Sequence, residues 1–204
     1  MSAERDQILA RVRDALAPLP HRASLPNWDE ELIQLRQNQA AIDLWERFSE
    51  RLRAVNGTPL DSSAALVALL EQHGWLCGYC DPALWSLLGE SFTSRLTVSP
   101  QFDRHNVDRY DFGITDAAGA IAETGTLILT DGSTASRLGA LAPWVHVAVL
   151  RRAQIYDDIS AALAALPQDP NVVWITGPSK TADVEGILIE GVHGPGVQVA
   201  LLID

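Results

Sequence analysis

The sequence is poor in lysine, in cysteine and in long apolar runs. Lys180 is the only lysine, and the formal net charge of the chain is −11. An acidic chain without a basic patch is repelled by phosphate backbones and anionic lipids, so we expect no nucleic-acid or membrane partner. The first residues, MSAERDQILARVRDAL, alternate charged and apolar residues, and no apolar run approaches the length of a membrane span. We therefore expect a soluble, cytoplasmic protein.

The scarcity of cysteine limits redox and metal chemistry. The 2 cysteines, Cys77 and Cys80, are too few for a disulfide framework or an iron-sulfur cluster. A lone CxxC is a redox pair or half a metal site, but we favour two small buried residues at a strand end. Asp103, His105 and Asp108 could ligate a metal, although a solvated loop is the commoner case. Since a GxGxxG fingerprint is also missing, we predict that this chain binds no cofactor and no metal.

The pattern of apolar residues divides the chain near residue 56. A helix is predicted over residues 3–16, and a longer one over 29–55, where apolar residues recur every three or four positions. Residues 1–55 therefore form a helical N-terminal extension. In residues 56–204 strand-like and helix-like segments alternate; DSSAALVALLEQHG, for example, reads as a helix capped by Asp61 or Ser62 and ended by Gly74. This alternation predicts a layered α/β domain with a mixed or largely parallel sheet.

One stretch, ITGPSKTADVEGILIEGVHGPG (residues 175–196), concentrates residues that shape the backbone. Gly177 permits a sharp exit from a strand, and Ser179, Lys180 and Thr181 follow with hydroxyls and an ammonium. With a short helix from residue 183 through 190, this arrangement would be an anion-binding loop for a carboxylate or phosphate. An exposed lysine in a capped turn is the equally plausible reading. His193 could contact a ligand or take its proton, or satisfy loop carbonyls.

A second stretch, DFGITDAAGAIAETGTLILTDGS, places Glu123 between two strand-like segments. Gly125 would allow a sharp bend there, and Thr126 could donate a hydrogen bond. A solvent-facing glutamate is the commoner outcome. If the two stretches meet at the carboxyl edge of the sheet, Glu123 and His193 would line one pocket with Ser179, Lys180 and Thr181, and the glycines would let the backbone approach a ligand.

The segments GIT, AIAETGT, ITGPSKTADVE and GVHGP, in this order, resemble the lactate utilization protein C family, whose members carry a LUD domain. The resemblance covers roughly residues 60–204. It implies a three-layer α/β/α sandwich similar to the sugar-phosphate isomerase and coenzyme A transferase group. It also implies a role in oxidising L-lactate to pyruvate with two partner subunits that carry iron-sulfur clusters. The sequence has Ala118 where the family often has an acid; Asp116 could substitute.

Three functions are compatible with these patterns. The chain could bind a small carboxylate and supply acid-base groups while iron-sulfur partners take the electrons. It could instead be an assembly subunit without chemistry. As a third alternative, it could be a stand-alone enzyme that acts on a small phosphorylated or acyl substrate with Glu123 as base or nucleophile. Whether the chain is catalytic is thus left open by the sequence.

Overall fold

The structure, a computed structural model, describes residues 3–18, 43–182 and 188–203, and the chain divides into two compact units, 1–41 and 42–204. The first unit contains helix α1 (Ala3–Leu16), as predicted. Glu4 and Asp6 in its first turn and Arg13 in its last turn have the charges that favour the two ends of a helix dipole.

The predicted helix over residues 29–55 lies partly outside the described residues. Its described part forms α3 (Leu44–Ala54), which begins where the Asp43 carboxylate accepts hydrogen bonds from the Trp45 and Glu46 amides. This helix was predicted to belong to the N-terminal extension, whereas it is part of the second compact unit. The reason is packing, because Phe48 and Leu52 are completely buried in that unit.

The second unit has the alternating elements that the sequence predicts. Its other helices are α4 (Ser63–His73), α5 (Trp85–Leu88), α6 (Arg137–Leu141) and α7 (Ile159–Ala165). Its strands are β1 (Thr58–Leu60), β2 (Cys77–Cys80), β3 (Thr97–Ser99), β4 (Phe112–Asp116), β5 (Gly119–Ile121), β6 (Thr126–Thr130), β7 (Val145–Leu150), β8 (Ile155–Tyr156), β9 (Val172–Ile175), β10 (Lys180–Ala182), β11 (Leu188–Glu190) and β12 (Val197–Leu202). Short 3₁₀ turns connect some of them: η1 (Pro82–Leu84), η2 (Gly89–Ser91), η3 (Val107–Arg109) and η4 (Arg152–Gln154).

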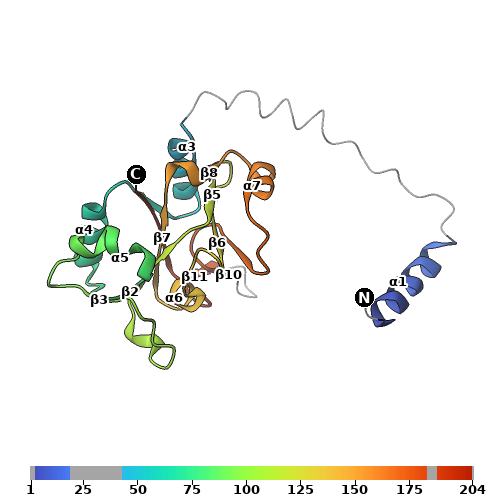
Figure 1. Ribbon diagram of the computed structural model, residues 1–204, viewed down its shortest axis with the longest axis horizontal. Coiled ribbons are helices and arrows are strands. Elements are labelled where there is room, and N and C mark those ends of the chain that lie inside the picture. Colours follow the sequence, from blue (N-terminus) through green and yellow to red (C-terminus); the bar gives the residue numbers. More distant parts are fainter. Residues whose placement is uncertain (1–2, 19–42, 183–187, 204) are drawn as a thin grey trace. The chain divides into compact units, whose positions relative to one another are not determined.

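Six strands form a central sheet in the order β1-β12-β7-β4-β2-β3, in which each of the five neighbouring pairs is parallel. Figure 1 shows β7 in the middle of the unit, with α4 and α5 on one side and α7 on the other. The predicted α/β class with a largely parallel sheet flanked by helices is therefore confirmed. The predicted helix through residue 190 is wrong at its end, because β11 occupies Leu188–Glu190 and pairs with β10; residues 183–187 lie outside the described residues.

Alternation along the strands gives the sheet two apolar faces. On one face Val145, Val147 and Val149 of β7 pack with Leu66 and Leu70 of α4. The other face of β7 presents His146, Ala148 and Leu150. Small side chains there allow a second layer of structure to pack closely on the sheet.

That second layer is a four-stranded sheet in the order β8-β5-β6-β9, joined by α3. Alanines from both sheets, including Ala120 of β5 and Ala148 of β7, lie in the shared core with Phe48 and Leu52 of α3. Helix α7 covers the far side of this sheet, where Ala162 packs on Ile121 and Ile128. Strand β9 is an edge strand, and the loops that follow it form the candidate site.

Candidate functional site

A cavity of about 310 Å³ lies between the loop after β9 and the loop before β12. Three residues predicted from the sequence line it, namely Gly177, Ser179 and His193. Two backbone hydrogen bonds join the loops: the Ser179 amide donates to the Pro195 carbonyl and the Gly191 amide donates to the Ser179 carbonyl, each over 2.9 Å. Segments that are separated by fifteen residues or so in sequence are thereby held against each other, with Ser179 at their junction.

The remaining wall of the cavity is mixed in polarity. It consists of Leu141, Val173, Trp174, Ile175, Thr176, Pro178, Gly194, Pro195 and Gln198. Neither lysine nor arginine is among these lining residues, so a ligand would be held by neutral hydrogen-bonding groups and by His193. A volume near 300 Å³ is at the lower end of the range for small-molecule pockets.

The Gln198 side chain belongs to a buried polar network that crosses three neighbouring strands. His146 on β7 lies between Thr115 on β4 and Gln198 on β12, with its Nε2 2.9 Å from Thr115 Oγ1 and its Nδ1 3.0 Å from Gln198 Oε1. All three side chains are buried. Burial lowers the pKa of His146 to about 4, so its imidazole is neutral at pH 7.

Two other predicted residues, Lys180 and Thr181, lie on β10 and are not among the lining residues of this cavity. Lys180 is opposite Glu190 in the β10-β11 hairpin, and its Nζ is 3.5 Å from Glu190 Oε1. The same Nζ is 3.5 Å from the Val55 carbonyl. The ammonium thus contacts the end of α3 and a carboxylate, while the preceding Ser179 faces the cavity.

Glu123 lies in the turn between β5 and β6, and its side chain is exposed. Its amide donates to the Asp157 carbonyl over 3.1 Å. The carboxylate is not part of the lining of the cavity that contains His193. Thr126 does not line the cavity but contacts a residue that does, because its buried hydroxyl is 2.8 Å from that of Thr176. The structure therefore does not gather all of the predicted residues around one cavity.

Gly125 and Gly177 have positive φ angles of 69° and 75°. A β-carbon on Gly125 would lie 2.5 Å from the Leu52 amide nitrogen, and one on Gly177 would lie 2.2 Å from the Val55 carbonyl oxygen. Both contacts are with the backbone at the C-terminal half of α3. The close approach that these two glycines permit is to a helix, whereas the sequence analysis expected a ligand there.

Comparison with known proteins places the cavity in a recognised domain. The LUD domain matches residues 92–203, which is 112 of 204 residues and includes both loops and Gln198. The chain belongs to the LUD-domain family. An uncharacterized protein of Neisseria meningitidis serogroup B is similar to this LUD-domain protein over its whole length, with 37% identity over 230 aligned positions that cover 100% of the chain and 94% of the relative.

Other relatives bear a functional name. A lactate utilization protein C of Deinococcus radiodurans is 34% identical over 119 residues, covering 56% of this chain and 55% of the relative. One from Exiguobacterium sp. is 38% identical over 114 residues, covering 52% and 50%. The matches thus span only about half the length of these relatives. A solved DUF162 family protein from Deinococcus radiodurans shares the fold, with a TM-score of 0.54, 23% identity, and coverage of 78% of this chain and 96% of that one.

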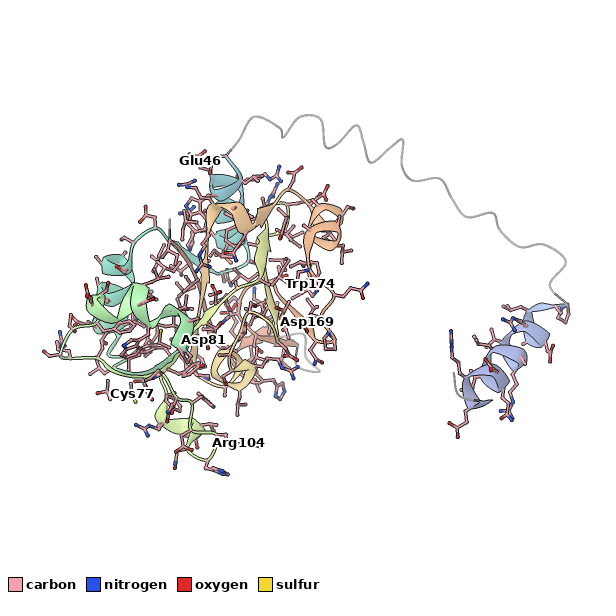
Figure 2. The ribbon with its side chains drawn as sticks, in the orientation of Figure 1. Glu46, Cys77, Asp81, Arg104, Asp169 and Trp174 are labelled. Carbon is pink, nitrogen blue, oxygen red and sulfur yellow. The ribbon has the colours of Figure 1, made fainter. Side chains whose placement is uncertain are left out.

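The carboxyl edge of the central sheet in this LUD-domain protein contains a buried network that the sequence analysis missed. Asp81, which follows β2, is completely buried and accepts hydrogen bonds from the Tyr79 hydroxyl and from the amides of Asp116 and Ala135. Burial raises the pKa of Asp81. Figure 2 shows Asp81 well inside the unit, far from the exposed Arg104. The sequence offers one signal for this network, an aspartate directly after a strand-like segment.

Asp116, which could have replaced the acid missing at Ala118, pairs with Arg151 instead. Asp116 Oδ1 is 3.2 Å from a guanidinium nitrogen of Arg151, and burial raises the pKa of the Asp116 carboxyl. Ala118 packs beside the core under α7. Neither residue is among those that line the cavity with His193.

The two cysteines differ in environment. Cys80 is completely buried, and burial raises the pKa of its thiol to about 12, while Cys77 is half-buried. Three positions apart on one strand, they project to opposite faces of the sheet, which does not suit a redox pair. Within residues 3–18, 43–182 and 188–203, no cluster of three or more His, Cys, Asp and Glu side chains could hold a metal ion, and no helix is long and apolar enough to span a bilayer.

Proposed function

We propose that this LUD-domain protein is a subunit of a lactate utilization system and binds a small carboxylate in the cavity between its two glycine-rich loops. The observation that carries the proposal is the junction at Ser179, where two backbone hydrogen bonds bring Ser179 and His193 to one cavity. The similarity to proteins named lactate utilization protein C supports the choice of pathway. The shared fold adds no information about the ligand.

The lining of the cavity sets the strength of binding. A carboxylate would accept hydrogen bonds from the Ser179 hydroxyl and from an N–H of His193. Because the carboxylate is charged, each such bond contributes about 1.5 kcal/mol net, and the cavity lining contains no lysine or arginine to add an ion pair. Two or three bonds of this kind predict a dissociation constant that is roughly millimolar. Such an affinity suits a metabolite that is abundant in the cell.

The proposed division of labour puts the electron acceptors on other chains. Oxidation of L-lactate to pyruvate releases two electrons and two protons. His193 is the titratable side chain among the lining residues, and we assign to it the acceptance of one of these protons, while the other passes to water. We assign the electrons to iron-sulfur clusters on two partner subunits, since the sequence of this chain has too few cysteines for such a cluster.

The alternative of a stand-alone enzyme with Glu123 as base or nucleophile gains no support from the cavity, because Glu123 is not among its lining residues. The alternative of an assembly subunit makes a different prediction, namely association with partners without any binding of carboxylate. Ligand titration therefore separates it from the proposed function.

The first experiment is a titration of the purified chain with L-lactate, followed by NMR shifts of backbone amides. We expect saturable shifts in the two loops, and a loss of affinity of about tenfold in both Ser179→Ala and His193→Ala, the scale of one lost hydrogen bond. Ser94→Ala and His105→Ala, at exposed positions, are the matched controls. Absence of any shift in the loops at saturating lactate would rule out this carboxylate site.

The second experiment concerns the partners. We expect the tagged chain to recover iron-sulfur proteins from native extract under anaerobic, low-salt conditions, detected by iron analysis and mass spectrometry. The purified chain alone should be colourless and inert toward lactate with artificial electron acceptors. Recovery of this chain alone, or stoichiometric flavin absorbance in it, would contradict the proposed division of labour.

A further inference from the structure

Gln198 is among the residues that line the cavity, and the alternation of side chains along β12 indicates the direction of its side chain. Val199 and Leu201 of the same strand pack in the core under α4. Ala200 and Leu202 pack in the opposite core, between the two sheets. Alternation along β12 therefore directs Gln198 toward the layer that contains β9, on the cavity side. Its side chain is the most deeply buried polar group in that wall, with the whole residue only 1% exposed.

The orientation of the Gln198 amide follows from its neighbours. Its Nε2 lies 3.3 Å from the His146 carbonyl oxygen and 3.1 Å from the Val199 carbonyl oxygen. Carbonyl oxygens only accept hydrogen bonds, so the NH₂ group must face them; the reverse orientation would place Oε1 against both carbonyl oxygens. Both amide N–H groups are thereby used within the protein. Only the oxygen Oε1 remains to meet other groups.

The tautomer of His146 follows from the orientation of the Gln198 amide. Because Gln198 Oε1 is an acceptor, the Nδ1 of His146, 3.0 Å away, must donate to it. The neutral ring then has an unprotonated Nε2, which accepts from the Thr115 hydroxyl over 2.9 Å. Thr115 thus holds the His146 ring in one tautomer, and His146 holds the Gln198 amide in one orientation. A carbonyl oxygen accepts two hydrogen bonds, and the one from His146 leaves one lone pair of Oε1 for a donor in the cavity.

We propose that Gln198, positioned by His146 and Thr115, selects ligands that carry a hydroxyl donor next to the carboxylate, that is, 2-hydroxy acids over 2-oxo acids. The inference rests on the proposed carboxylate site and adds its specificity. A hydroxyl at C2 donates to Oε1. A keto oxygen at C2 would place two acceptors against each other in a buried wall, where an unmatched polar group is costly.

The selection has a consequence for turnover in the proposed system. The reduced acid would be bound in preference to its oxidised product, because the reaction removes the hydroxyl group whose hydrogen bond Gln198 Oε1 accepts. Product release would then be favoured without any movement of the loops. The effect depends on the C2 substituent alone and not on the carboxylate.

The experiment compares three ligands that differ only at C2: L-lactate, pyruvate and propionate. Their dissociation constants are measured by NMR titration for the unmodified protein. We expect lactate to bind about tenfold more tightly than propionate, the value of one hydrogen bond, and pyruvate to bind no better than propionate. Gln198→Met, which keeps the length of the side chain and removes the acceptor, should make lactate and propionate equal. Gln168→Met, the same change at an exposed position, is the control.

The positioning role has its own readout. Histidine ¹⁵N shifts should report the Nδ1–H tautomer of His146 in the unmodified protein at pH 7. Thr115→Val removes the hydroxyl donor to Nε2; it should reduce the lactate-to-propionate ratio while binding of propionate is retained, and it also serves if Gln198→Met does not fold. An Nε2–H tautomer, or a ratio unchanged in both variants, would overturn the proposal.

The outcomes separate the two proposals. Equal binding of all three acids by the unmodified protein would leave the carboxylate site standing and refute selection by Gln198. No binding of any acid would refute the site and the selection together. Preference for pyruvate over lactate would also refute the assigned orientation of the amide.

Discussion

Replacement of Gly125 by alanine tests whether the β5-β6 turn holds α3 on the LUD domain. Gly125 has a φ of 69°, and an added β-carbon would lie 2.5 Å from the Leu52 amide nitrogen and 2.6 Å from the Arg51 carbonyl carbon. A left-handed backbone costs an L-residue about 1–2 kcal/mol. The contact is with backbone atoms of a packed helix, which cannot rotate away as a side chain would, and overpacking of this kind costs about 1–3 kcal/mol.

These two terms predict that Gly125→Ala lowers the free energy of unfolding by about 2–5 kcal/mol. For a protein of this size the melting temperature should fall by roughly 10 °C. Urea and thermal unfolding followed by circular dichroism measure the change. Tryptophan fluorescence adds a second probe, to which Trp45 of α3 contributes; its ring stacks on Phe48 with centroids 5.7 Å apart.

Alanine substitutions at two other glycines separate the cost of backbone strain from the cost of the close contact with α3. Gly74 has a φ of 72° but nothing within 4 Å of an added β-carbon, so Gly74→Ala reports backbone strain alone. Gly132 has no such φ, and its nearest neighbour would be 3.6 Å away, so Gly132→Ala should change stability by no more than about 0.5 kcal/mol. If Gly125→Ala destabilises no more than Gly74→Ala does, the close approach to α3 is not a constraint and the reasoning is refuted.

Three further predictions concern charged groups. Asp157→Asn should cost about 1–2 kcal/mol in urea unfolding, because it weakens the partner of the buried Arg47 guanidinium; an unchanged midpoint would contradict this. Burial lowers the pKa of His146 from 6.5 in the unfolded chain to about 4, so its contribution to stability, about 3 kcal/mol, is present above pH 6.5 and lost as the pH falls to about 4. His146→Gln should flatten that part of the pH profile, and a slope of equal size in the variant would assign it to other groups. Lys180→Ala should change stability by less than about 1 kcal/mol and leave lactate affinity unchanged, since the half-exposed ammonium pairs with Glu190. A loss of lactate affinity as large as in Ser179→Ala would show that Lys180 takes part in binding.

Elements with strong local signals were predictable from the sequence. The helix α4 begins where Ser62 Oγ accepts from the Ala65 amide and ends at Gly74 in the left-handed conformation, both as the pattern indicates. The alternation of strands and helices predicted the α/β class, which the structure confirms. The loop residues Ser179 and His193 were candidates because glycine and proline mark an unusual loop. These features depend on residues close together in the chain.

The composition of the cavity could not be predicted in the same way. Lys180 and Ser179 are adjacent in sequence, and only the β10-β11 pairing decides that the lysine meets Glu190. Glu123 stands beside Gly125 and Thr126, yet the turn leaves its carboxylate exposed. The approach of Gly125 and Gly177 to α3 requires a helix that precedes them by many residues, and a sequence shows a glycine without showing what lies next to it.

The buried network of Thr115, His146 and Gln198 shows the same division between local and tertiary information. Apolar residues flank His146 and Gln198, and Thr115 ends the strand-like segment DFGIT, so a strand is predictable for each of the three from the sequence. The three strands become neighbours only in the folded protein, with Gly113 opposite His146 and His146 opposite Gln198. Register between strands depends on the packing of whole sheets, because side-chain alternation specifies which face a residue takes but not which residue of another strand it meets.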